Sequence, residues 1–201
     1  LIYFKNLLAE IKFDESMYVR AVEKENWQEV WLYKNGVKSL VYKGKSWDKD
    51  GLYGDLIQNL KFSADGRYLS IEIGNWEQDW IRVYDSVSEK LSEVVAPNEL
   101  YGFSEDLNFF WACEPNGMSG GGIALVRLSM LDQPHLQYAP VQNLDLNVSE
   151  CVKFYPIYEK ANHKNQGGIE FKLEGSDELS NAWLNGNEKL LYSDTLLPQK
   201  K

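Results

Sequence analysis

The chain is poor in the residue types that build catalytic and metal sites. Its 201 residues include only two histidines, His135 and His163, and each lies in a polar stretch typical of a surface turn. No Cys-x-x-Cys pair occurs, so the usual zinc and redox motif is missing. We therefore expect no catalytic residue, no metal site and no cofactor.

Cysteine is equally scarce. Cys113 and Cys151 are the two cysteines of the chain, and two thiols in a chain of this length do not make a disulfide scaffold. We expect both to be buried free thiols. A disulfide between them stays an alternative, because its geometry needs Cα atoms within about 7 Å, which a sequence does not show. If the disulfide forms, it favours an oxidising compartment.

Long apolar runs are absent as well. No run approaches the ~18 residues needed to cross a bilayer, so we expect no membrane partner. Residues 1–5 have neither a long apolar stretch nor the small-residue cleavage site of a signal peptide. These features favour the cytoplasm and leave the periplasm open.

Positive charge is in deficit. The 21 Lys and Arg residues face 30 Asp and Glu residues, which gives a formal net charge of −9. Binding to phosphate backbones depends on Lys and Arg, so we expect no direct binding to nucleic acid. A basic protein would be steered toward this surface, although acidity also serves solubility alone.

Aromatic residues are abundant, at 13% of the chain, and some recur in order. Ile11-Lys12-Phe13, Asn26-Trp27 and Trp31 are matched by Leu60-Lys61-Phe62, Asn75-Trp76 and Trp80. A repeat of about 40–50 residues is the size of one propeller blade or a similar supersecondary unit. The spacing therefore predicts repeated units of similar design.

The turn and strand signals extend this repeat along the chain. Asp65-Gly66 and Asn35-Gly36 are strong hairpin signals, and residues 68–73 alternate between apolar and polar side chains. We predict an all-β single domain of about four four-stranded antiparallel repeats, at 7–43, 55–96, 100–142 and 150–193. These would form a small or incomplete β-propeller, and a β-sandwich is the alternative.

Two segments resemble a known family. Phe62-Ser63-Ala64-Asp65-Gly66-Arg67-Tyr68-Leu69, followed by Ile81-Arg82-Val83-Tyr84-Asp85, resembles the blade consensus of TolB-type and Trp-Asp-repeat propellers. The resemblance implies four-stranded antiparallel blades, and it implies binding rather than catalysis. The chain departs from these families in blade number, because four blades are fewer than they usually have.

Two acidic loops that carry tryptophan are the predicted partner-binding site, because Trp is an enriched interface anchor. Their residues are Trp47, Asp48, Asp50 and Asp55 in one loop, and Trp76, Glu77 and Asp79 in the other. We predict a non-enzymatic acidic module that binds a basic protein, in its sharpest form an inhibitor or immunity-type protein masking a nuclease toxin. The alternatives are a TolB-like periplasmic assembly factor and a glycan hydrolase on a propeller scaffold.

Overall fold

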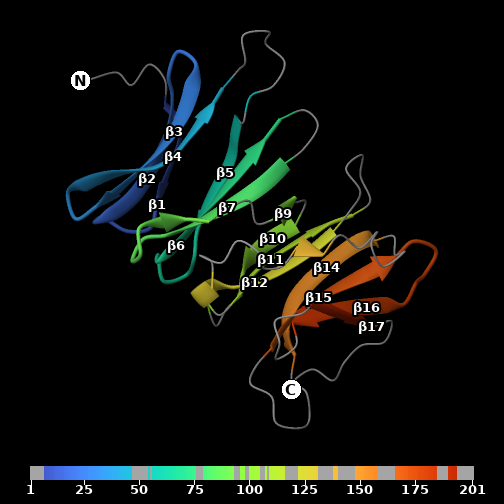
Figure 1. Ribbon diagram of the computed structural model, residues 1–201. Coiled ribbons are helices and arrows are strands. Elements are labelled where there is room, and N and C mark those ends of the chain that lie inside the picture. Colours follow the sequence, from blue (N-terminus) through green and yellow to red (C-terminus); the bar gives the residue numbers. More distant parts are fainter. Residues whose placement is uncertain are drawn as a thin grey trace. The chain divides into compact units, whose positions relative to one another are not determined.

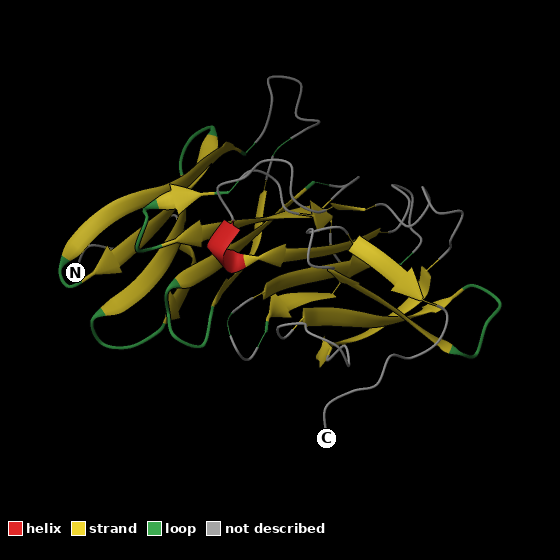
Figure 2. Ribbon diagram, turned by 60° about the horizontal axis from the view of Figure 1, so that its bottom comes forward, coloured by secondary structure: helices red, strands yellow, loops and turns green. Residues whose placement is uncertain are grey.

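The described part of the chain is all-β. The computed structural model describes residues 7–46, 54, 56–75, 79–92, 96–97, 100–104, 107, 109–115, 122–130, 138–139, 148–157, 166–184 and 190–193. Strands dominate these residues, with a three-residue 3₁₀ turn, η1 (Leu128–Met130), as the helical element (Figures 1 and 2). The chain divides into two compact units, residues 1–93 and 94–201, and each is described by itself.

The first unit contains two antiparallel sheets, each with a path of four consecutive strands. The first sheet has the order β1-β2-β3-β4, from β1 (Leu7–Lys12), β2 (Met17–Glu23), β3 (Trp27–Lys34) and β4 (Val37–Lys45). The second has the order β5-β6-β7-β8, from β5 (Leu56–Phe62), β6 (Tyr68–Gly74), β7 (Asp79–Asp85) and β8 (Lys90–Leu91). Along each of these paths every strand pairs with the next one in the chain, so each path is a simple meander.

One face of each of these sheets meets in the core of the first unit. Alternate residues of a strand point to opposite faces of its sheet. The buried cluster accordingly takes alternate positions from several strands, among them Val19 and Ala21, Val30 and Leu32, and Leu69, Ile71 and Ile73. Burial of such side chains is worth roughly 1.5–3 kcal/mol each, which makes this cluster the main source of stability for the unit.

The second unit repeats the plan. It begins with β9 (Ala96–Pro97), and its two sheets have the orders β10-β11-β12-β13 and β14-β15-β16-β17. The strands are β10 (Leu100–Phe103), β11 (Phe109–Glu114), β12 (Gly122–Arg127), β13 (Tyr138–Ala139), β14 (Val148–Ile157), β15 (Gln166–Leu173), β16 (Leu179–Leu184) and β17 (Leu190–Ser193). The buried cluster Cys113, Ile123, Val148, Ile169, Phe171 and Ala182 joins the two sheets.

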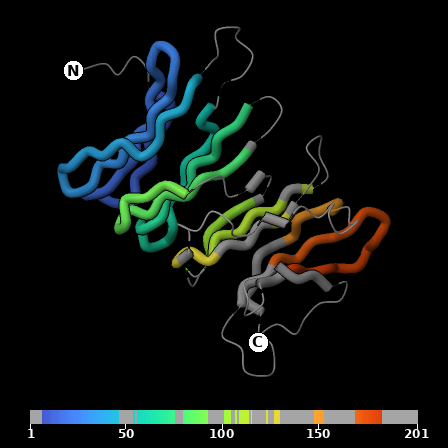
Figure 3. Tube along the Cα trace, in the orientation of Figure 1, coloured from blue at the N-terminus to red at the C-terminus, as the bar shows by residue number. Residues whose placement is uncertain are grey.

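These topologies confirm the predicted fold class of four-stranded antiparallel repeats. Along the four-strand path of each sheet the strand order follows the chain order, so successive paths take successive colours in Figure 3. A β-sandwich instead sends its connections from one sheet to the other in Greek-key order. The sheets therefore have the topology of propeller-like blades.

The same turn joins the first and second strands of two blades, β5 to β6 and β10 to β11. In the second sheet the Ser63 hydroxyl accepts a hydrogen bond from the Tyr68 backbone amide at 2.9 Å. In the third sheet Ser104 and Phe109 form the same bond at 2.9 Å. The residue three places after each serine has a positive φ, which is 73° for Gly66 and 56° for Leu107. The repeat therefore extends into the third sheet, β10 to β13, through backbone geometry, although leucine replaces the glycine there.

The expectation of two free thiols is wrong. Cys113 of β11 and Cys151 of β14 form a disulfide, with their Cα atoms 5.9 Å apart. The two cysteines lie in adjacent sheets of the second unit, and both are among the residues packed in its buried cluster. Closing a 38-residue separation by a covalent bond restricts the unfolded chain and so stabilises the unit.

Candidate functional site

The residues predicted to bind a partner fall almost entirely outside the described residues. This holds for Trp47, Asp48, Asp50, Asp55, Trp76 and Glu77. The backbone of Asp79 begins β7, where it pairs with Gly74 of β6. The grouping of these seven residues into a site stays a prediction.

The outer face of the first sheet is the most distinctive surface among the described residues. Because Val19, Val30 and Leu32 point into the core, the residues next to them point to the opposite face of the sheet. We call this the aromatic–cationic face, and it consists of Tyr18 and Arg20 of β2, Trp27, Glu29, Trp31 and Tyr33 of β3, and Lys38, Leu40, Lys43 and Lys45 of β4. This face was not among the sites predicted from the sequence, although alternation along three neighbouring strands carries its signal.

Two stacked tyrosines lie at one end of this face. Tyr18 and Tyr33 are directly opposite one another in the register of β2 and β3, and their rings stack at 4.6 Å with planes 6° apart. The Arg20 guanidinium lies 5.1 Å from the Tyr18 ring centre and 5.4 Å from that of Tyr33. Arg20 is also paired with Glu10 of β1. The guanidinium is thus held in place by two rings and a carboxylate.

Two lysines cover the tryptophans of β3. The Lys38 ammonium lies 3.9 Å from the Trp31 ring centre, and the Lys43 ammonium lies 3.9 Å from that of Trp27. A cation over an indole face is attracted by the ring quadrupole, with a strength of about 0.5–1 kcal/mol at exposed sites. The indoles therefore act as platforms that hold two positive charges above the sheet.

Glu29 lies between the two indoles in the sequence of β3 and holds both of them in place. Its carboxylate accepts hydrogen bonds from the Trp27 Nε1–H at 2.8 Å and from the Trp31 Nε1–H at 2.9 Å. Burial acts to raise the pKa of Glu29, but these two hydrogen bonds and the charges of Lys24 and Lys43 outweigh it, so the net pKa is lowered. Glu29 is only 8% exposed, and it stays ionised as an anchor beneath the rings.

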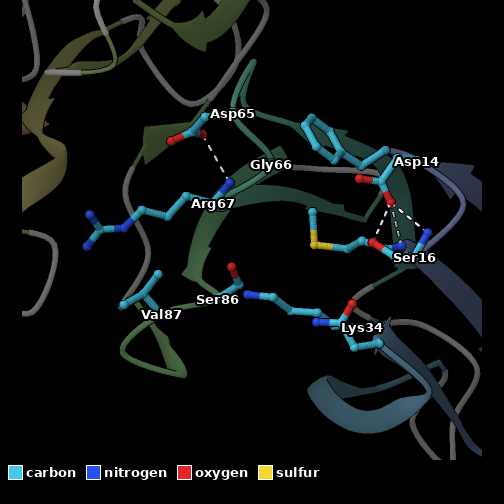
Figure 4. Close-up of a pocket in the computed structure, with 11 residues that line it drawn as sticks. Asp14, Ser16, Lys34, Asp65, Gly66, Arg67, Ser86 and Val87 are labelled. Carbon is cyan, nitrogen blue, oxygen red and sulfur yellow. Dashed lines mark hydrogen bonds between the residues drawn. The ribbon is translucent and has the colours of Figure 1, made fainter.

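A pocket of about 300 Å³ lies at the turn end of the first unit (Figure 4). The Lys34 side chain extends across it toward Ser86 (Figure 4). The Asp14 carboxylate accepts bonds from the backbone amides of Ser16 and Met17 at 2.7 and 2.8 Å. Hydrogen bonds from Ser16 hold the pKa of Asp14 below its usual value. This carboxylate therefore closes the turn between β1 and β2.

The second acid of the pocket has a similar structural role. Asp65 accepts a hydrogen bond from the Ser63 hydroxyl at 2.6 Å and one from the Arg67 backbone amide at 3.0 Å. Both carboxylates are thus engaged in closing their own turns. The pocket is a junction of hairpin turns, and its acids are not arranged as a pair facing a common substrate.

Arg67 and Asp85 tie the start of β6 to the end of β7. The guanidinium donates from Nε and Nη2 to the two carboxylate oxygens, at 3.0 and 2.8 Å. This bidentate pairing raises the pKa of Arg67 well above its ordinary value. Burial would raise the pKa of Asp85, but the Arg67 hydrogen bonds and the Val87 amide reverse the shift, so it is lowered. Both groups stay charged near neutral pH.

One motif bears on the expectation that no residue is catalytic. Residues 117–121 read Gly-Met-Ser-Gly-Gly, which fits the letters of the nucleophile elbow Gly-x-Ser-x-Gly. That elbow joins a strand to a helix, whereas this segment joins the antiparallel strands β11 and β12. The segment itself lies outside the described residues, and its flanking strands do not supply the context of an elbow.

The described residues also bear on metal binding and on membrane spans. Within the described ranges, no group of three or more His, Cys, Asp or Glu side chains is placed to hold a metal ion. Among those same residues, no helix has the length and apolar character needed to cross a membrane.

The chain is similar to several solved structures, at low sequence identity. No protein-family model matches the chain, and no curated protein matches its sequence. The tricorn protease structure matches 93% of this chain with a TM-score of 0.45 at 10% identity. A prolyl endopeptidase matches 94% with a TM-score of 0.44 at 14% identity. The Myceliophthora thermophila Swd1 β-propeller domain matches 96% with a TM-score of 0.35 at 10% identity.

The chain is much shorter than these proteins. It spans 22% of the tricorn protease chain, 30% of the prolyl endopeptidase chain and 62% of the Swd1 chain. These identities and TM-scores are too low to support an argument. The description of the sheets as blades therefore depends on the strand order and hydrogen bonds of this chain itself. The described sheets define a protein of propeller-like blades.

Proposed function

We propose that this protein is a non-catalytic module that binds a basic protein. Meanders of four strands hold their connecting turns at the ends of rigid sheets, and such turns are common sites of recognition. The formal net charge of −9 would steer a basic partner toward these turns. The predicted loops at 47–55 and 75–79 belong to this proposal as its first contacts.

The observation that carries the proposal is an acidic turn in the second unit. The turn between β15 and β16 displays three exposed carboxylates, those of Glu174, Asp177 and Glu178. Gly175 gives the turn its shape with a φ of 77°. The Glu178 backbone amide donates to the Ser176 hydroxyl at 3.1 Å, which helps to order the turn. The carboxylates are therefore presented outward on a defined hairpin.

In its sharpest form the partner is a basic enzyme, such as a nuclease toxin. The substrate phosphates of such an enzyme bind to lysine and arginine side chains. Carboxylates placed at the same side chains would mask them and inhibit the enzyme. We propose this inhibitor or immunity-type role as the specific case of binding to a basic protein.

The test is affinity capture from the source cell with a charge-neutralised variant. The wild-type chain should retain a basic protein at low salt and release it as salt rises, because screening weakens charge pairing. The triple variant Glu174→Gln, Asp177→Asn and Glu178→Gln should release that protein at lower salt than wild type. Glu23→Gln, on the first sheet, serves as the control and should behave like wild type. Equal retention by all three chains would refute the role of the turn.

The disulfide favours a second candidate, an assembly or scaffold protein of TolB type in an oxidising compartment. Disulfides persist in the periplasm and outside the cell, whereas cytosolic thiols are kept reduced. The Cys113–Cys151 bond supports this setting. Thiol alkylation of the chain as isolated from its source cell tests it. Protection of both cysteines until a reductant is added supports this candidate, and immediate labelling contradicts it.

A further inference from the structure

We propose that the aromatic–cationic face of the first sheet is a second docking surface, and that it binds an acidic surface of a partner protein. The proposal concerns residues that play no part in the acidic turn. This face is positive, whereas the acidic turn between β15 and β16 is negative, so either proposal can fail while the other holds.

The aromatic–cationic face is open. In the second sheet of the same unit both faces are buried, as Leu69 and Ile71 on one face and Ser70 and Val83 on the other are each at most 1% exposed. In the first sheet one face is buried in the core, whereas the opposite face has half-buried rings and exposed lysines. Leu40 lies opposite Trp31 on this face and is 46% exposed. An apolar residue surrounded by charged groups is typical of the centre of an interface.

The contacts within this face determine what it can bind. Sugars and nucleobases bind aromatic residues by stacking on bare ring faces. Here Tyr18 and Tyr33 stack on each other, and lysines cover Trp27 and Trp31. A stacking ligand would have to displace these groups. The accessible chemistry is therefore the cations themselves, and they attract carboxylates.

The face is complementary in charge to an acidic partner. Lys38, Lys43 and Lys45 line β4 on this face and are all exposed. The acids nearby are already engaged, since Glu29 binds both indoles and Glu10 pairs with Arg20. The face is thus locally positive in a chain whose net charge is −9. Such a patch attracts an acidic surface and orients its approach.

The side chains of this face are already held in place before a partner binds. Glu29 holds both tryptophans, and each tryptophan holds a lysine. Side chains that are already ordered lose less conformational entropy when a partner binds. A partner carboxylate would therefore meet lysines that are already positioned above the sheet.

The experiment measures binding of fluorescently labelled poly-L-glutamate by anisotropy, with the full chain at low salt. The test variant is K38E/K43E, and the matched control is K61E/K90E, which makes the same charge change on the second sheet. Wild type and control should bind, and the test variant should bind about tenfold more weakly or not at all. K38R/K43R keeps both positive charges and should bind poly-L-glutamate as wild type does. Circular dichroism checks that each variant keeps its strands.

Several results would overturn the proposal. The first is that wild type does not bind poly-L-glutamate. The second is that K61E/K90E loses as much binding as K38E/K43E. Tighter binding of an oligodeoxythymidylate through the same lysines would assign the face to nucleic acid. Dimerisation of wild type that K38E/K43E abolishes would assign it to a second copy of the chain. Retention of a basic protein by the acidic turn would be unaffected by any of these results.

Discussion

Single residues set the geometry of the hairpin turns, and Gly66 is the clearest case. Its φ of 73° is rarely adopted by residues that carry a side chain. A Cβ at this position would lie 2.5 Å from Met17 Cε and 2.8 Å from the Phe13 ring. The glycine therefore serves both the turn and the close packing between the first and second sheets.

This dual role gives a graded prediction for glycine substitutions. Gly36 and Gly175 also have positive φ angles, but a Cβ there would meet nothing within 4 Å. Changing either to alanine should lower the free energy of unfolding by about 1 kcal/mol, from backbone strain alone. Gly66→Ala should cost about 2–4 kcal/mol, because overpacking adds to the strain. Chemical denaturation of the three variants measures the difference, and equal losses would contradict the proposed clash.

The Arg67–Asp85 pair gives a prediction about acid stability. The pKa of Asp85 is lower in the folded protein than its ordinary value, so the folded state favours the ionised form. Its contribution is present above the unfolded pKa of about 3.9 and is lost as the pH falls through the lower folded value. Asp85→Asn should lower stability by about 1 kcal/mol at neutral pH and flatten the acid limb of the stability curve. Unfolding measured from pH 7 to low pH checks this, and parallel curves would rule the contribution out.

At the level of elements, the hairpins followed from local chemistry. Asp65-Gly66 and Asn35-Gly36 predicted turns that the structure contains, because a positive φ is a property of the turn residues themselves. The alternation over residues 68–73 likewise predicted β6, whose positions 69, 71 and 73 enter the core. Local backbone preference was therefore sufficient to predict these two turns and strand β6.

The sequence did not predict how strands that are distant along the chain lie next to one another. The disulfide depends on β11 and β14 lying in adjacent sheets with their Cα atoms 5.9 Å apart, and no local pattern encodes that distance. The aromatic–cationic face depends on the register that sets Tyr18 opposite Tyr33 and Glu29 opposite Lys43. Each strand showed its own alternation, but the joint surface appears only once the three strands are aligned.

The disulfide gives the prediction for this scale. Replacing both Cys113 and Cys151 by alanine should lower the free energy of unfolding of the second unit by about 2–4 kcal/mol, because the unfolded chain gains freedom when the crosslink is removed. A single Cys113→Ala variant should show a similar loss, since either change removes the bond. Denaturation with and without reductant measures it, and a wild-type chain insensitive to reductant would speak against the bond.

At the scale of the whole molecule, the crosslink lies entirely within the second of two compact units. Stability in proteins is not uniform, and local opening can be followed by amide hydrogen exchange. We predict that reduction of the disulfide speeds exchange in β10 to β17 and leaves β1 to β8 nearly unchanged. A uniform rise in exchange across both units would show instead that the chain unfolds as one cooperative body.

The molecule also combines an overall negative charge with one locally positive sheet face. We propose that these surfaces of opposite sign recognise partners by charge and that the protein performs no chemistry on them. The most direct test is calorimetric titration of the purified basic partner with the full chain at increasing salt. We predict saturable, stoichiometric binding that weakens steadily as salt rises, with the partner left chemically intact. Salt-independent binding, or conversion of the partner to a product, would contradict a non-catalytic role for this protein.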